Sequence, residues 1–203
     1  MQLDQQIDML RQEIAVMARK AEGIFDRALK AMETRNDDLV IEVLDLDPEL
    51  NAYEIKMDAL CMRILALSEP YAVDFRYVYS VSKTTRDLER IGDESKTIAK
   101  WSRKLPGPPS QELIRLGQKA KEALAVAVDS LLKMDAVQAN RVLDLEIDVD
   151  AIEDDILKSA TDVPQAFIAK AMERVGDMAT NIAENVIFCV KAQDIRHSEG
   201  QIA

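Results

Sequence analysis

Apolar residues recur every three or four positions along the first half of the chain, which is the spacing of amphipathic α-helices. The first predicted helix spans residues 3–34, and one apolar stripe along it consists of Ile7, Leu10, Ile14, Met17, Ala21, Ile24, Ala28 and Met32. A second helix is predicted over residues 37–67, capped by Asn36 or Asp37. Pro48 lies inside it and should kink or restart the helix. A third helix is predicted over residues 70–104, with Pro70 at its first position.

The pattern starts again after the segment Pro106-Gly107-Pro108-Pro109-Ser110, which has the composition of a linker. Three further helices are predicted over residues 111–134, 136–159 and 163–195. We therefore expect one three-helix unit over residues 1–105, a Pro/Gly linker over 106–110, and a second three-helix unit over 111–203.

The two units share sequence as well as helix order. VLDLDPELNAYE, from Val43, aligns with VLDLEIDVDAIE, from Val142, and LERIGD, from Leu88, aligns with MERVGD, from Met172. An internal repeat of three helices predicts an all-α fold of two tandem three-helix bundles related by a pseudo-twofold axis. The second hairpin should be several turns shorter than the first on both arms, since its matched positions are closer together.

The composition agrees with a helical bundle and narrows the set of partners. Hydrophobic residues make up 48% of the chain and aromatic residues only 4%, so aliphatic residues and nine Met must fill the core. The net charge of −11 disfavours non-specific binding to nucleic acid or anionic lipid and favours cations. No signal peptide or long uncharged apolar run is visible, so we expect a cytoplasmic protein without direct membrane insertion. Cys61 and Cys189 lie in apolar helical stretches and are expected to be reduced, buried and structural.

The repeated Glu-Arg-apolar-Gly-Asp string is the main candidate for chemistry. Glu89 and Asp93, like Glu173 and Asp177, are four residues apart and share a helix face. Paired like charges and a helical glycine both destabilise a helix, the glycine by about 1 kcal/mol relative to alanine. A bound cation or a close helix contact at the glycine would explain why this combination occurs twice.

A second polar set occupies equivalent places on the neighbouring helix of each unit. It consists of Asp47 and Asn51 in the first half and Glu146 and Asp150 in the second. If the two helices of each hairpin pack antiparallel, both sets converge into a site of oxygen donors that suits Fe³⁺, Mn²⁺, Mg²⁺ or Ca²⁺. The alternative is that Arg90 and Arg174 neutralise the acids in surface ion-pair networks.

Other chemistries lack their residues. A ferritin-like di-iron centre needs Glu-x-x-His on two helices, and the single histidine, His197, is expected to be an exposed terminal residue. No Ser/His/Asp or Cys/His set can be assembled around it, and no glycine-rich loop follows a strand. The sequence argues against an enzyme.

With these motifs the chain resembles the PhoU family of phosphate-signalling proteins over nearly its whole length. The stretch from Arg63 to Lys100 is similar to the first family signature, with Pro70, Ala72, Asp74, Phe75 and Arg76 before LERIGD and Phe75 in place of the usual Leu. AFIAKAMERVGDMATNIAE, residues 166–184, resembles the second signature, and VKAQDIRH, residues 190–197, resembles the C-terminal end of the family.

The resemblance implies a six-helix protein, usually a homodimer, some members of which bind iron or other metals through Glu/Asp-x-x-x-Asp motifs. The candidate metals are iron, manganese and magnesium. Carried over by position, the metal-ligating candidates are Asp47, Glu89 and Asp93 in the first half and Glu146, Asp150, Glu173 and Asp177 in the second. Asn51 stands where the family pattern favours an acid.

The resemblance also implies a regulatory role. The protein would repress the phosphate-starvation response when phosphate is plentiful and modulate phosphate uptake. It would act as a cytoplasmic adaptor, peripheral at the inner membrane, between a phosphate ABC transporter and a sensor histidine kinase. The competing hypotheses are a carboxylate-rich metal-binding bundle without a phosphate role and a purely structural helical scaffold.

Overall fold

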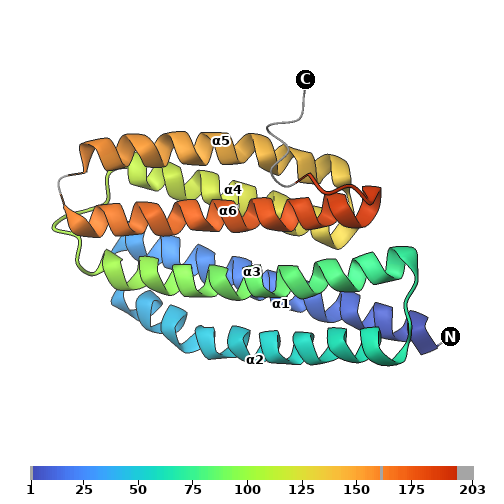
Figure 1. Ribbon diagram of the computed structural model, residues 1–203. Coiled ribbons are helices and arrows are strands. Elements are labelled where there is room, and N and C mark those ends of the chain that lie inside the picture. The colour runs from blue at the N-terminus through green and yellow to red at the C-terminus, as the bar shows by residue number, and fades with distance from the viewer. Residues whose placement is uncertain (1, 161, 196–203) are drawn as a thin grey trace, which may run out of the picture.

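The chain folds into six long α-helices in a computed structural model that describes residues 2–160 and 162–195 (Figure 1). The side chains of Gln2 and Asp47 are not among the described parts, and His197 lies outside the described residues. The helices are α1 (Gln2–Thr34), α2 (Asp37–Leu67), α3 (Ala72–Ser102), α4 (Gln111–Lys133), α5 (Ala136–Ser159) and α6 (Val163–Lys191). The described residues therefore form an all-α fold, as predicted.

Most helix boundaries lie within two residues of their predicted positions, and local caps explain them. The Asn36 side chain accepts a hydrogen bond of 2.8 Å from the Asp38 N–H at the start of α2. Helix α2 is continuous through Pro48, and its N-terminal part bends toward the rest of the bundle (Figure 1). The proline thus bends the helix without restarting it.

Two predicted helix ends were wrong. Helix α3 begins at Ala72, so Pro70 is not the first helical residue; Glu69 has a left-handed backbone, with φ 43°, that interrupts the helical path before it. Helix α6 ends at Lys191, four residues earlier than predicted, because Ala192 adopts φ 55° and its N–H caps the Phe188 carbonyl at 2.9 Å.

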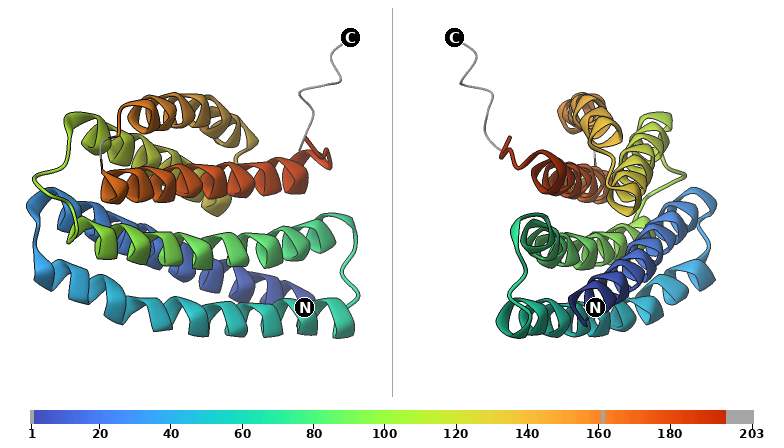
Figure 2. Two further views of the ribbon diagram at one scale, coloured as in Figure 1. Left: turned by 60° about the vertical axis from the view of Figure 1, so that its left-hand side comes forward. Right: turned by 90° about the vertical axis from the view of Figure 1, so that its right-hand side faces the viewer.

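The helices form two three-helix bundles that pack against each other through α3 and α6. Helices α1–α3 make the first bundle and α4–α6 the second, and Figure 2 shows the two layers from the side and from the end. The α2–α3 and α5–α6 connections lie at opposite ends of the molecule, so α3 and α6 run antiparallel (Figure 1). This arrangement is the one that the internal repeat predicts.

One hydrophobic core spans both bundles. The predicted α1 stripe from Ile7 to Met32 is entirely buried. Where the bundles meet, a Cβ built at Gly117 of α4 would lie 2.9 Å from Leu29 Cδ2 of α1, so a larger residue there would have to displace the Leu29 side chain. Cys61 and Cys189 are free and buried, as predicted.

The second hairpin is the shorter one, as predicted, but its helices are not several turns shorter on both arms. Helices α5 and α6 have 24 and 29 residues, whereas α2 and α3 have 31 each. Among the described residues, no helix combines the length and the apolar character needed to cross a membrane.

Candidate metal site

Helices α5 and α6 approach each other closely at the second Gly-Asp motif. Gly176 is buried on α6, and a Cβ built there would lie 3.0 Å from Val149 Cγ1 of α5. The glycine therefore lets α5 lie against α6 at this level. Asp150 follows Val149 and Asp177 follows Gly176, so the same contact brings these two acids together.

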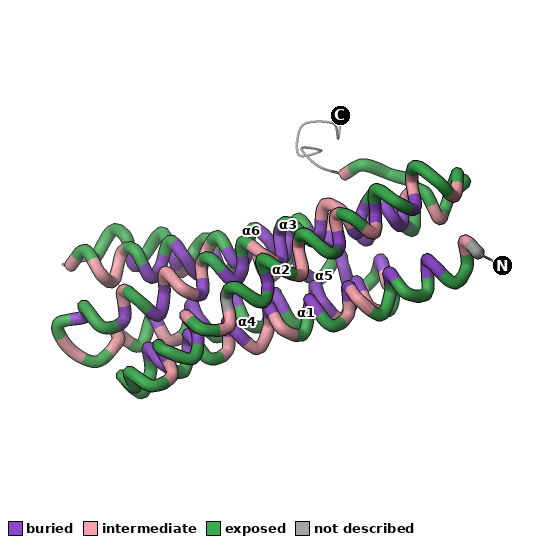
Figure 3. The backbone as a smooth tube through the Cα atoms, turned by 90° about the horizontal axis from the view of Figure 1, so that it is seen from below, coloured by how far each residue is buried: buried purple, intermediate pink, exposed green. Residues whose placement is uncertain are grey.

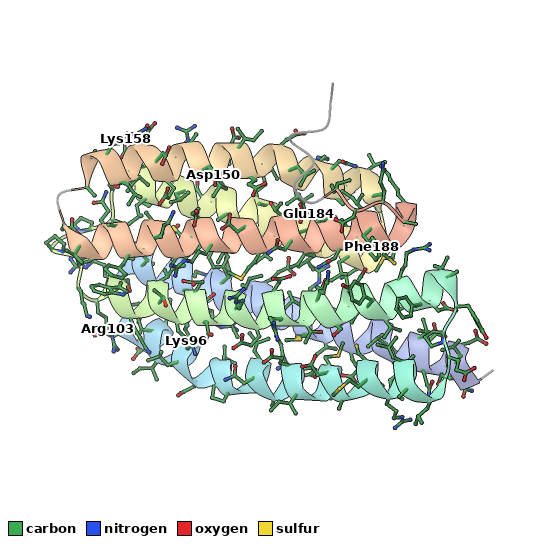
Figure 4. All side chains as sticks on the ribbon, viewed as in Figure 1. Lys96, Arg103, Asp150, Lys158, Glu184 and Phe188 are labelled. Carbon is green, nitrogen blue, oxygen red and sulfur yellow. The ribbon has the colours of Figure 1, made fainter. Side chains whose placement is uncertain are left out.

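Three carboxylates meet at this crossing. Asp150 of α5 and Glu173 and Asp177 of α6 each offer one oxygen, and these oxygens lie within 4.8 Å of one another. Figure 4 labels Asp150 on α5, directly above α6. Glu146 lies one turn before Asp150 on α5, near enough for its charge to act on Asp150 and Asp177, but it is not one of the three residues whose oxygens lie within 4.8 Å of one another. We call Asp150, Glu173 and Asp177 the acidic cluster.

Burial first, and neighbouring like charges second, raise the pKa values of three acids at this crossing. Burial, together with the neighbouring charges of Glu173 and Asp150, raises the pKa of Asp177 to about 6. Partial burial and then the Glu173 charge raise the pKa of Asp150. Burial also raises the pKa of Glu146, while the Thr180 hydroxyl acts in the opposite direction. A cation at this crossing would offset the smaller part of these pKa shifts, which comes from repulsion between neighbouring carboxylates.

One cation of the chain already reaches the cluster. Lys170 Nζ lies 3.0 Å from Glu173 Oε1 and 3.2 Å from Glu153 Oε1, and so links α6 to α5. Glu153 is buried, with 4% of its surface exposed. Neither Glu153 nor Lys170 was a predicted site residue, although the repeat alignment placed Glu153 opposite Glu54 and thereby offered a signal for the former.

The donor set fits a hard divalent cation. The other oxygen of Glu173, Oε2, is buried and accepts no hydrogen bond. This oxygen is therefore available to bind a cation away from solvent. Carboxylate oxygens are the preferred ligands of Mg²⁺, Mn²⁺ and Ca²⁺, and water completes their coordination. Glu173, Asp177 and Asp150 are the side chains that would hold such an ion.

The first half differs from the second at several positions of the equivalent site. Asn51 replaces the Asp150 carboxylate, and Lys96, at the position of Thr180, lies 2.6 Å from Asp93 Oδ1. Glu89 is half-buried on α3. The Asp47 side chain lies outside the described parts, so the first-half site of Asp47, Glu89 and Asp93 stays a prediction.

The arginine of the second motif does not bind the acids of its own motif. Arg174 Nη1 lies 3.1 Å from Glu94 Oε1 of α3, so this ion pair joins the two bundles. It belongs to a polar seam between α3 and α6 that sequence analysis missed. The seam consists of Arg76, Ser80, Thr84, Asp87, Glu94, Arg174, Asn181 and Asn185.

Comparison with known proteins gives one consistent result. The profile of the PhoU domain matches residues 14–102 and 113–186. The phosphate-specific transport system accessory protein PhoU of Escherichia coli (strain K12) is 29% identical over 215 residues, covering 98% of this chain and 89% of the relative. The corresponding homolog of Pseudomonas aeruginosa is 30% identical over 213 residues, covering 97% of this chain and 88% of the relative.

Solved structures extend the likeness to three dimensions. The crystal structure of PhoU from Pseudomonas aeruginosa matches with a TM-score of 0.89 at 28% identity and covers 94% of this chain and 99% of that one. The phosphate transport system regulatory protein PhoU from Streptococcus pneumoniae shares the fold, with a TM-score of 0.79 at 21% identity, covering 95% of this chain and 98% of that one. Two domain matches, the relatives and the shared fold together establish that the chain belongs to the PhoU family.

Proposed function

We propose that this protein regulates phosphate transport and represses the phosphate-starvation response while phosphate is plentiful. The observation that carries the proposal is the match along the whole chain to relatives named as accessory proteins of a phosphate-specific transport system. The protein acts as a cytoplasmic adaptor between a phosphate ABC transporter and a sensor histidine kinase. A signal passes from transporter to kinase because each partner binds different conformational states of this protein with different affinity.

Gene deletion tests this role directly. Without the gene, a starvation reporter such as secreted phosphatase should be strongly expressed in phosphate-rich medium, and the intact gene should silence it again. Copurification of the tagged protein with the transporter and the kinase in stoichiometric amounts tests the adaptor role. A reporter that stays silent in the deletion strain argues against repression by this protein.

We also propose that the acidic cluster binds a divalent or trivalent metal ion, with iron, manganese and magnesium as candidates. The support is the convergence of Asp150, Glu173 and Asp177 and the unpartnered buried oxygen of Glu173. Calorimetric titration with Mn²⁺ should show a site whose affinity falls at least about tenfold in Asp177→Asn. Asp144→Asn removes an exposed acid from α5 outside the cluster and should leave the affinity unchanged. Equal affinity in all three proteins would exclude the site.

A metal-binding bundle without a phosphate role is the second candidate, and the same cluster favours it. The two candidates differ in stoichiometry and in the phenotype of variants. An adaptor takes up few ions per chain, whereas a storage protein takes up many. A strain that carries only Asp177→Asn separates them further, since loss of repression with normal protein abundance would connect the metal to phosphate signalling.

A further inference from the structure

A pocket lies where α3 packs between α2 and α6, and its volume is about 490 Å³. Cavities of this size hold small organic molecules, whereas a single ion needs far less space. Figure 3 shows the three helices from the α2 side, with buried and exposed positions alternating along them. None of the metal-ligating candidates whose side chains are described lines this pocket. It is therefore a different place from the acidic cluster.

Carboxylates from all three helices line the pocket. Glu54 and Asp58 come from α2, Asp87 from α3 and Glu184 from α6, where Figure 4 labels it. Glu54 and Asp58 are half-buried and lie on successive turns of α2. Neither of these two carboxylates forms an ion pair or a hydrogen bond with another described residue. The α2 side of the pocket therefore offers two carboxylates that the described protein leaves without a counter-ion.

Asp87 is the most buried of the four acids, with 8% of its surface exposed. Its hydrogen bond within the described protein comes from the Asn181 amide to Oδ1, at the long distance of 3.5 Å. The second oxygen, Oδ2, receives no hydrogen bond from the described residues. A buried carboxylate with so little hydrogen bonding is costly. An ammonium group in the pocket would supply the missing donor.

The repeat shows that the fold does not require these acids. The alignment of the two halves places Ala171 of α6 opposite Asp87 and Leu157 of α5 opposite Asp58. Ala171 is itself buried, so the second bundle fills the position of Asp87 with an apolar side chain. A carboxyl group at such a place lowers stability. Ligand binding would explain why the first bundle has one there.

The basic residues of the pocket do not cancel this negative charge. Lys83 and Arg86 are the two cations among the described lining residues, against four carboxylates. With all of these groups ionised, the lining carries a net charge of −2. The Lys83 ammonium also lies 4.5 Å from the centre of the Tyr79 ring, where the aromatic face attracts it. The charge of the pocket therefore favours a cation over an anion.

The spread of the carboxylates suits an elongated cation with several charges. A metal ion needs oxygens that converge on one point. Among the described residues, three acids converge in this way at the acidic cluster and not in this pocket. Here the carboxylates stand on three helices, and packed helices lie about 8–10 Å apart. A linear polyamine spaces its ammonium groups along a flexible chain, and its methylene groups can pack on Met62 of the lining.

We propose that this pocket binds a linear polyamine, with one ammonium group on Asp87 and another on Glu54 and Asp58. Asn181 and Asn185 donate their amide N–H groups to other side chains, and their carbonyl oxygens can accept hydrogen bonds from the ligand. The bound polyamine spans the junction of the two bundles, since α2 and α3 belong to the first and α6 to the second. The proposal depends neither on the role in phosphate regulation nor on metal binding at the acidic cluster.

Calorimetric titration of the full chain with spermidine tests the pocket. Burial raises the pKa of Asp87 to about 6, so its carboxylate and the amines of spermidine are all charged at a pH of about 8. In about 150 mM NaCl, which screens weak surface attraction, we expect one site per chain with a dissociation constant below about 1 mM. Asp87→Asn should raise this constant at least about tenfold, and Asp58→Asn about threefold to tenfold.

Two control variants separate the pocket from the rest of the acidic surface. Asp144→Asn removes one exposed acid of α5, and Asp177→Asn removes one member of the acidic cluster. Both make the same change in net charge as Asp87→Asn and should leave the spermidine dissociation constant within about twofold of the parent value. Mg²⁺ added at matched ionic strength should not displace spermidine. The helical circular dichroism signal of every variant shows that it has folded.

Three results would overturn the proposal. The first is the absence of saturable binding by the parent chain up to about 10 mM spermidine. The second is a dissociation constant that Asp87→Asn and Asp58→Asn change no more than Asp144→Asn does, which would mean that spermidine follows the net charge of the surface. The third is displacement of spermidine by Mg²⁺ at matched ionic strength, which would make the pocket a metal site.

Discussion

Gly176 of α6 packs directly against Val149 of α5, since a Cβ at Gly176 would lie only 3.0 Å from Val149 Cγ1. Val149 is fully buried and β-branched, so it has little freedom to move aside. The next residue on each helix is an acid of the candidate metal site. The contact between Gly176 and Val149 therefore brings together both the two helices and the two acids, Asp177 and Asp150.

We expect Gly176→Ala to destabilise the protein by about 1–2 kcal/mol. The overlap with Val149 should outweigh the helix propensity of alanine, which favours the variant by about 1 kcal/mol. Urea unfolding measures the difference. Gly107→Ala is the control, because nothing lies within 4 Å of the added Cβ there. An equally or more stable Gly176→Ala variant would show that α5 and α6 can separate at no cost.

The buried carboxyl of Asp87 should make stability depend on pH. Burial raises its pKa to about 6, although the Asn181 side chain, at 3.5 Å, and Arg90 and Arg86 act against the shift. The folded state thus holds this proton more tightly than the unfolded chain, and the free energy of unfolding should fall as the pH rises from about 4 to about 6. The contribution is at most about 3 kcal/mol.

Asp87→Asn should remove this part of the pH dependence and gain stability relative to the parent as the pH rises. Unfolding in urea at pH 4.5 and pH 7.5 gives the comparison, with Asp144→Asn as the control for loss of an exposed acid. If the two variants have the same pH profile, the proton on Asp87 is not coupled to folding.

Lys170 should compete with a metal ion for Glu173. Its ammonium group lies 3.0 Å from Glu173 Oε1, and its pKa is raised chiefly by this hydrogen bond. Lys170→Gln removes the competing charge, so we expect Mn²⁺ affinity to rise roughly threefold to tenfold. The metal-free variant should also melt at a lower temperature, because Glu153 and Glu173 lose their counter-ion.

Calorimetry and thermal melting with and without Mn²⁺ measure both effects. Lys158→Gln is the matched control, since Lys158 pairs with Asp154 and Asp155 at an exposed site on α5. Weaker Mn²⁺ binding by Lys170→Gln would mean that Lys170 orients the acids for the ion.

The ion pair between Arg174 and Glu94 should stabilise the contact between the two bundles. Burial raises the pKa of Glu94, and Arg174 opposes this rise. Arg174→Ala leaves the half-buried carboxylate without its partner and should cost about 1–2 kcal/mol. Adding Glu94→Gln should restore part of the loss, which a double-mutant cycle by urea unfolding would reveal. Additive losses would instead mean that the pair contributes nothing beyond its members.

The helices could be predicted closely because each one carries its own local signals. The apolar stripe of α1 and the caps at Asn36 and Ser110 depend on neighbouring residues alone. Pro70 misled the prediction for the same reason. A proline suits the first turn of a helix, yet Glu69, the residue before it, has a left-handed backbone, which residues other than glycine seldom adopt and which the local sequence does not announce.

The acidic cluster was predictable only in part. The repeat pointed to Asp150, Glu173 and Asp177, because it places them at matching positions. Lys170 was not predictable, since only the packed α5–α6 pair brings its ammonium group between Glu153 and Glu173. The pairing of Arg174 with Glu94 was not predictable either, because Glu94 lies 80 residues away in the other bundle.

The opposite directions of α3 and α6 give the molecule two unlike ends. At one end stands the longer α2–α3 hairpin, and at the other the shorter α5–α6 hairpin (Figure 1). Between the two ends, the polar seam between α3 and α6, which includes Arg76 and Arg174, joins the two bundles. The apolar contact of Gly117 with α1 joins them as well. The two tips therefore present different hairpins, so a partner that recognises only one hairpin would bind at one defined end of the molecule.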